Sequence, residues 1–153
     1  MSYEAVRQIV EKRFFDTYSS TNAKAHGASA YVEGHDFVQP SKDCGEQSKS
    51  LNNGSWLVLS VVDGGSSIRA FNKGMRKTSG FVRFTLYVAE GTGTKKLREL
   101  ADYVDSIVGF QGGVSGTTNA GNLYTQVGQL RKLTDNDLGY LKYALDFDYD
   151  YYE

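Results

Sequence analysis

The chain has 153 residues, 13% of them aromatic, and a formal net charge of −1. This composition fits one folded domain with an ordinary hydrophobic core, and it excludes both a disordered chain and binding to nucleic acid through bulk positive charge. Its one cysteine, Cys44, excludes an intramolecular disulfide, and no run reaches the roughly 18–20 apolar residues of a membrane helix. We therefore expect a single domain over residues 1–153, made in the cytoplasm and without a membrane segment.

The first third of the chain predicts a helix, a short strand and a long loop. Apolar residues recur at helical spacing from Tyr3 to Tyr18 with charged residues between them, which is typical of an amphipathic helix. A short strand is expected over 28–32. The polar stretch 39–54 has no apolar period and is expected to be a long loop, which in a compact domain is usually functional or mobile.

The middle of the chain predicts two antiparallel strands. Residues 56–62, WLVLSVV, are almost continuously apolar and favour a central strand. Residues 80–89 alternate strictly, which is typical of a sheet covered on one side. The glycine-rich stretch between them predicts an extended hairpin loop over 63–79.

The last third predicts a second helix followed by two strands. A stripe of apolar residues from Leu97 to Val108 indicates a helix over 94–108 that ends at Gly109. A strand is expected within 122–133, and residues 140–152 alternate over their whole length. The order α-β-β-β-α-β-β predicts an α+β fold of two layers, in which two helices pack on one face of a mainly antiparallel sheet.

The turn before the second helix has the order strand, glycine turn, helix that phosphate-binding loops use. A P-loop requires G-x-x-x-x-G-K-[ST], and a dinucleotide fingerprint requires G-x-G-x-x-G. The sequence Gly91-Thr92-Gly93-Thr94 is followed by Lys95 and Lys96 and matches neither. An anion at the start of the helix stays open, but we expect a structural turn in which Gly91 and Gly93 permit the corner and Thr94 caps the helix.

The remaining candidates for chemistry are sparse. His26, His35, Asp36 and Cys44 lie close in sequence but lack the spacing of a metal site, and no nucleophilic triad or elbow motif is present. We expect no catalytic residue, metal or cofactor, and a protein that is not an enzyme.

Two stretches carry charge of one sign. Residues 66–78 are basic, with Arg69, Lys73, Arg76 and Lys77 and no acid, and include the apolar Phe71. They are consistent with a nucleic-acid patch or with an arm that contacts a neighbouring subunit, and the apolar members favour the arm. Residues 146–153 are acidic. The two stretches together suggest a basic and an acidic pole that complement each other in an oligomer.

The acidic stretch contains a row formed by Asp146, Asp148 and Asp150. Alternating aspartates along a strand project side by side and do not form a calcium loop. The row fits a solvated sheet face that discourages edge aggregation, or a negative wall past which DNA slides.

The arrangement of these motifs resembles the tail terminator (tail completion) proteins of long-tailed bacteriophages. The resemblance covers roughly residues 28–151 and rests on GHDFVQP, WLVLSVV, RKTSGFVRFTLYV running into GTGT, the helix LxxLADYVDSIV and the closing aromatic strand. It implies a virion protein that forms a ring, expected to be a hexamer, at the head-proximal end of the tail. This ring would end polymerisation of the tail tube and join the tail to the head connector, with DNA passing through its lumen.

Within this resemblance, residues 66–78 are the expected arm toward a neighbour or the tube, and the acidic row is a candidate for the lining of the lumen, with bulk solvent as the alternative. The expected partners are copies of the same chain, the tail tube protein and the head-tail connector proteins, with DNA only in non-specific passage. Another head-tail joining protein or a tube subunit stays open as an alternative, as does a small-ligand-binding α+β domain.

Overall fold

The structure, a computed structural model, describes residues 2–33, 55–68, 76–89, 94–109, 123–133 and 140–152. The helical segments in these ranges are α1 (Ser2–Thr17), the 3-10 turn η1 (Ala23–Ala25) and α3 (Lys95–Val108). The strands are β1 (Ser29–Val32), β2 (Ser55–Ile68), β3 (Arg76–Ala89), β4 (Leu123–Thr125), β5 (Gln129–Lys132) and β6 (Tyr140–Tyr152).

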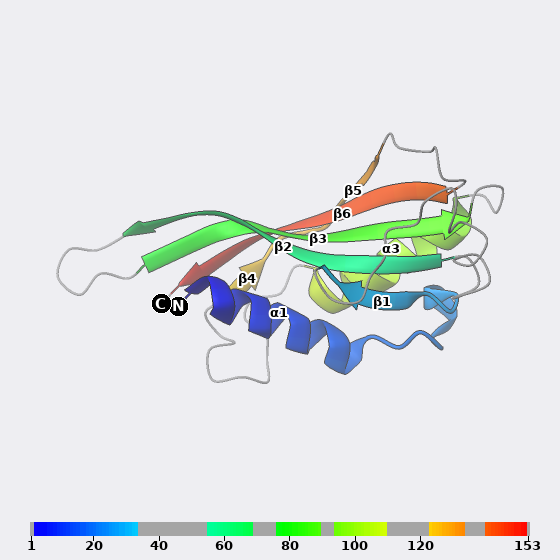
Figure 1. Cartoon of the computed structure of the whole chain (residues 1–153), viewed down its shortest axis with the longest axis horizontal. Helices are drawn as coiled ribbons and strands as arrows, with labels where there is room; N and C mark the ends of the chain where they lie inside the picture. The colour runs from blue at the N-terminus through cyan, green and yellow to red at the C-terminus, as the bar shows by residue number, and fades with distance from the viewer. Residues whose placement is uncertain are drawn as a thin grey trace.

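The strands form one six-stranded sheet in the order β1-β2-β3-β6-β4, with β5 also paired to β6 (Figure 1). Among the described strands, the short pairing of β1 with β2 is parallel and the other pairings are antiparallel. The predicted α+β class, the mainly antiparallel sheet and the order of elements are confirmed. The strand expected within 122–133 is two short strands, because the chain leaves the sheet direction at 126–128.

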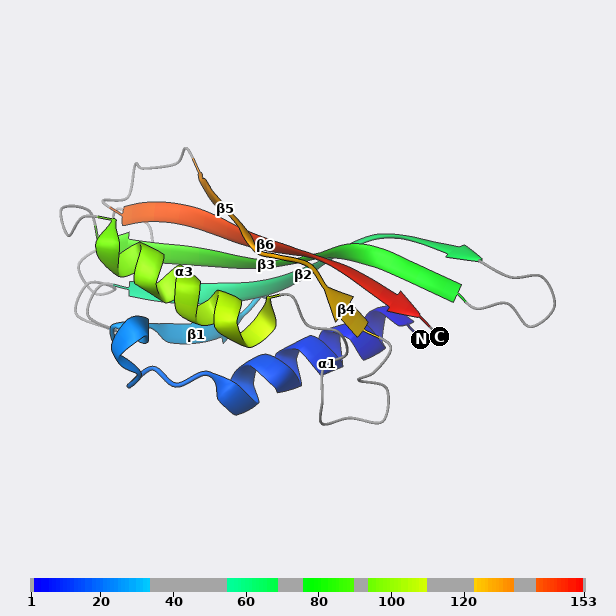
Figure 2. The same cartoon turned by 180° about the vertical axis from the view of Figure 1, so that it is seen from behind.

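Both helices pack on one face of the sheet, as predicted. Figure 2 shows α3 lying across the strands and α1 beside it. The core between helices and sheet takes one side of each element: Val6, Ile9, Val10 and Phe14 of α1; Leu97, Leu100, Val104 and Ile107 of α3; and Leu57, Leu59, Val82, Phe84, Leu86, Leu145 and Phe147 of the sheet. The alternation along 80–89 and 140–152 therefore identified the buried face correctly.

The partly buried Tyr18 and the buried Tyr103 hold the segment between α1 and β1 in place. The Tyr18 hydroxyl donates to the Ala28 carbonyl oxygen at 2.5 Å, and the Ser19 N–H donates to the Tyr103 hydroxyl oxygen at 3.0 Å. Burial raises the pKa of Tyr18 above its ordinary value, because the phenolate would lose solvation there. Satisfied hydroxyls at these positions fix where the chain leaves α1 and enters β1.

The loop predicted over 63–79 is wrong at both ends. Strands β2 and β3 stay paired as far as Ile68 opposite Arg76, with a bulge between Asp63 and Gly65. At Gly80 a side chain has no room, because a Cβ there would lie 2.2 Å from the Val62 carbonyl oxygen and 2.9 Å from the Tyr149 ring. Cross-strand pairing thus overrides the low strand propensity of Gly and Ser. The loop expected over 39–54 lies outside the described residues.

Strands β2 and β3 project as a hairpin past the first turn of α1 (Figure 1), and β6 pairs with β3 as far as Lys77. The start of α1 and the end of β6 lie at this same end of the molecule, as Figure 2 also shows. The base of the arm proposed from the sequence is therefore regular β-structure as far as Ile68 and from Arg76.

Candidate functional site

The face of the sheet opposite the helices carries the aspartates singled out in the sequence. Asp146, Asp148 and Asp150 alternate with core residues of β6 and share this outer face, as the alternation predicted. Cations from neighbouring strands lie among them, so the row is not a purely negative surface.

Asp146 is the centre of a half-buried charge cluster. Arg83 of β3 donates from Nε to Oδ1 at 2.8 Å and from Nη2 to Oδ2 at 3.0 Å, and Arg131 of β5 approaches Oδ2 at 3.3 Å. The hydrogen bonds to Asp146 raise the pKa of Arg83. Because this bidentate pair joins β3 to β6 directly across the ladder, it fixes the sheet as well as compensating the carboxylate.

Asp150 is also paired, whereas Asp148 is not. Lys77 Nζ lies 3.1 Å from Asp150 Oδ1, and the Ser79 hydroxyl donates to the same oxygen at 2.6 Å. The exposed Asp148 carboxylate has no ion pair or side-chain hydrogen bond with the described residues. With Lys77, Arg83 and Arg131 beside three aspartates, this end of the face carries no net charge.

The expected separation into a basic and an acidic pole is therefore wrong at Lys77. This residue begins the projecting hairpin, yet it pairs with the acidic strand of its own chain, and its Nζ also lies 6.0 Å from the centre of the Tyr152 ring. The two stretches are neighbours in the sheet. Of the other arm residues, Arg76 is the first residue of β3, and Arg69, Phe71 and Lys73 lie outside the described residues.

The other end of the outer face is aromatic. Trp56 stacks on Tyr87 with ring centres 5.0 Å apart and meets Tyr140 edge to face at 4.7 Å. Together with Val58, these side chains are at most 8% exposed. Sequence reasoning missed this cluster, although the continuous apolar run WLVLSVV signals a strand buried on both faces.

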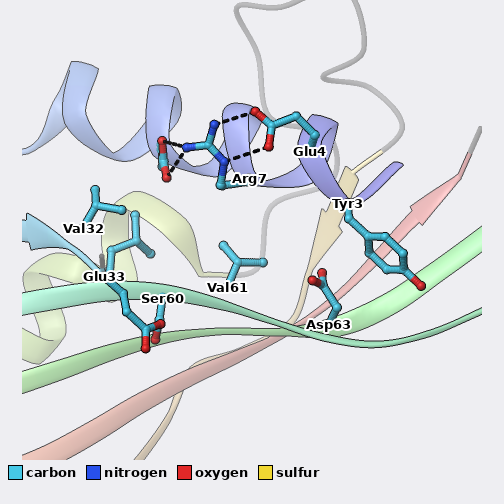
Figure 3. A pocket seen from close by; sticks show the side chains of 10 residues that line it. Tyr3, Glu4, Arg7, Val32, Glu33, Ser60, Val61 and Asp63 are labelled. Carbon is cyan, nitrogen blue, oxygen red and sulfur yellow. Dashed lines mark hydrogen bonds and ion pairs between the residues drawn. The ribbon is translucent and has the colours of Figure 1, made fainter. Parts of the chain in front are cut away.

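A groove separates α1 from the middle of β2 (Figure 3). It has a volume of about 240 Å³, and its lining includes Leu59 and Val61 on the sheet side and Glu4, Arg7 and Glu11 on the helix side. Figure 3 shows the Arg7 guanidinium held between two carboxylates: Arg7 bonds Glu4 at 2.5 Å and Glu11 at 2.7 Å. These hydrogen bonds raise the pKa of Arg7, and the Arg7 hydrogen bond lowers the pKa of Glu4.

Two further acids line the same groove. Asp63 lies at the end near Tyr3 and accepts a hydrogen bond from the Tyr149 hydroxyl at 3.0 Å. Glu33 follows β1 and is exposed. Neither forms an ion pair with the described residues, so the lining has four carboxylates and one guanidinium. The net charge of the groove is negative, and sequence reasoning missed it because its parts come from distant segments.

The predicted glycine turn is only partly described. Gly91 and Gly93 lie outside the described residues. Thr94 does occupy the N-cap position of α3, and its carbonyl oxygen accepts from the Arg98 N–H at 2.9 Å, but its side chain makes no capping hydrogen bond. The expectation of a side-chain cap is therefore wrong, because Thr94 has a helical backbone conformation instead of the extended one that a cap uses.

The metal candidates can be assessed in part. His26 Nε2 lies 2.5 Å from Glu99 Oε2 on α3, and Lys95 is 3.9 Å from the same carboxylate. His35, Asp36 and Cys44 lie outside the described residues, and those that are described contain no group of three potential metal ligands. Neither described α-helix has the length and apolar character needed to cross a membrane.

Comparison with known proteins shows that the fold of this chain is similar to that of solved structures. No protein-family model matches the sequence, and no characterised protein matches it in sequence. One solved structure without a functional description aligns with 99% of this chain and 96% of its own, with a TM-score of 0.62 and 17% identity. A chain from the virion of a native gene transfer agent particle aligns with 94% of this chain and 92% of its own, with a TM-score of 0.51 and 12% identity. At these identities the likeness shows a shared fold.

Proposed function

We propose that this chain is a structural protein of a phage-like virion and, more specifically, the terminator of a phage tail tube. The observation that carries the proposal is the alignment over nearly the whole of both chains with a protein of a gene transfer agent virion. Because the match spans the whole domain, it compares complete folds and not a common substructure.

The sequence resemblance to tail terminators adds the finer role. The segments that carry it are the strand 56–62, the strand and helix on either side of the GTGT turn, and the aromatic strand at the end. In the structure the described parts of these segments are β2, β3, α3 and β6, which are the centre of the fold. In the proposed ring, these elements form the body of each subunit and the β2–β3 hairpin reaches a neighbour.

The charges on the outer face of the sheet bear on how this chain would contact DNA in the lumen of the ring. Two of its three aspartates are compensated by cations, so a lumen lined by this face presents mixed charges in which only Asp148 lacks a cation. Such a surface gives passing DNA few uncompensated cations to bind, which suits a channel through which the phosphate backbone slides. Binding, ring formation and passage of DNA in this role need no catalytic group.

A tube subunit is the competing function, since the name of the virion neighbour does not specify a part of the particle. The two functions differ in closure: a terminator stops at one ring, whereas a tube subunit stacks without limit. The test adds the purified chain to growing tail tubes of the phage that encodes it and measures tube length by negative-stain microscopy. We expect short tubes capped at one end by one ring. Continued growth of the tubes, with this chain incorporated along their length, would show that the chain is a tube subunit and not a terminator.

A further inference from the structure

We infer that the groove between α1 and β2 receives the arm of a second copy of this chain, with Phe71 inserted over the apolar floor and the flanking cations facing the groove carboxylates. This inference rests on the proposed assembly function and identifies the partner surface of the arm.

The size and lining of the groove favour a side chain over a small molecule. Its volume of about 240 Å³ is below the range of about 300–1,000 Å³ that is usual for small-molecule sites. Leu59 and Val61 supply an apolar floor, and carboxylates stand at both rims. One large apolar residue with cations on either side matches this pattern, and aromatic anchors in such pockets dominate interface energies.

The chain itself contains a matching segment. Residues 68–77 read IRAFNKGMRK, with Phe71 between Arg69 and Lys73 and no acid from 66 to 78. The groove has an excess of carboxylates, and Asp63 and Glu33 form no ion pair with the described residues. The acidic strand β6 is a poorer receiver, because Asp146 and Asp150 are already paired. Opposite charges of this kind orient the two partners and speed their encounter.

The arm cannot enter the groove of its own chain. Strand β2 runs from the apolar floor at Val61 to Ile68, with the bulge after Asp63, so Ile68 lies roughly 20 Å beyond Val61 at about 3.3 Å per residue. Phe71 is three positions after Ile68, and three residues of chain span at most about 11 Å, so its side chain does not reach back to Leu59 and Val61. The hairpin also points away from the groove, past the first turn of α1 (Figure 1). The occupant is therefore a second copy, and each copy offers both an arm and a groove, as closed rings require.

Disulfide trapping in the full chain tests this pairing. In a Cys44→Ser background, a Phe71→Cys variant is mixed with a Tyr3→Cys variant, since Tyr3 lines the groove and is 38% exposed. The matched control replaces Tyr3→Cys by Asp102→Cys, an exposed position on α3 away from the groove. We expect a disulfide-linked dimer in the first mixture at about ten times the control yield, as a specific contact requires. Assembled rings with equal yields in both mixtures would overturn the docking inference and leave the proposed function standing.

Two further measurements separate the remaining outcomes. In a chain that carries both Phe71→Cys and Tyr3→Cys, an intramolecular disulfide would show that the arm reaches its own groove and would overturn the inference. Absence of any oligomer, alone or on tail tubes, would refute the proposed function and the docking with it. As a check that needs no cysteine, Asp63→Arg should weaken assembly about tenfold and Arg69→Asp in the same chain should restore it, whereas Asp102→Arg should have no effect.

Discussion

Replacing Phe84 by alanine tests whether the two layers share one core at this position. Phe84 is fully buried in the middle of β3. Its ring centre lies 4.8 Å from that of Phe14 on α1 and 5.9 Å from that of Phe147 on β6. The substitution therefore empties a site at which a helix and two strands meet, and the surrounding rings are held by three different elements.

A buried Phe→Ala change costs about 3–5 kcal/mol of unfolding free energy. We expect the upper half of this range, because the cavity cannot collapse without moving α1 and because two aromatic contacts are lost with the ring. At about 2–4 °C per kcal/mol for a chain of this size, the melting temperature should fall by roughly 8–20 °C.

The assay is urea unfolding at a fixed concentration at which the chain is monomeric, since assembly would add to the apparent stability. Phe15→Ala is the matched control: Phe15 neighbours Phe14, with ring centres 5.1 Å apart, but is 41% exposed. Its cost should stay below about 1 kcal/mol. Equal costs for the two variants, or a Phe84→Ala cost below about 1 kcal/mol, would refute the packing of α1 on this face.

Three further predictions address the strand glycine, alkaline pH and the arm. Gly80→Ala should cost about 1–3 kcal/mol in the same urea assay because its methyl group has no room beside Val62 and Tyr149, and an unchanged midpoint would contradict the close approach. Burial and the hydrogen bond to Asp63 raise the pKa of Tyr149 in the folded chain. Because the pKa of tyrosine in the unfolded chain is about 10, the stability that this group contributes is fully present below about pH 10. Above that pH, the free energy of unfolding should fall by at most about 1.4 kcal/mol per pH unit for this group. Tyr149→Phe should flatten that fall, and an equal slope in the variant would contradict the assignment. Charge reversal at Arg69 and Arg76, which leaves the pair of Lys77 with Asp150 in place, should abolish assembly while circular dichroism shows a folded monomer, and normal tail joining by this variant would refute the role of the arm.

The parts of the fold that the sequence predicts well are those in which one face of an element is buried. The alternation from Val82 to Val88 and from Leu145 to Tyr151 places these residues in the core because a strand has a period of exactly two. The stripe from Leu97 to Ile107 does the same for α3 at helical spacing. In each case the local pattern is sufficient to predict the buried face, since burial on one side makes apolar residues recur with the period of the strand or helix.

The parts that could not be predicted depend on contacts between distant segments. Gly80 lies in a strand because β3 pairs there with β2 and β6, and a glycine in a single sequence is first interpreted as a turn. The pairing of Arg83 with Asp146, 63 positions later, follows from the β3–β6 register, which no local pattern contains. The groove could not be predicted for the same reason, because its carboxylates come from α1, the end of β1 and β2.

The candidate arm shows both situations in one segment. Its basic and apolar composition is evident from the sequence, and so is its place between two strands. Its regular base is not evident, because the Ser- and Gly-rich stretch 64–67 is in the sheet through backbone pairing with β3, which no local pattern contains. Because this regular base extends away from the groove, we infer that the arm reaches a second copy.

The most direct test of the central claim is the mass of the purified full chain in solution, measured by light scattering over a concentration series with and without tail tubes. The proposed terminator predicts a single closed species of about six subunits that does not grow further with concentration, alone or on the tube end. A monomer at every concentration that also ignores tail tubes would contradict the assembly function, and a mass that rises without limit would show a tube subunit instead.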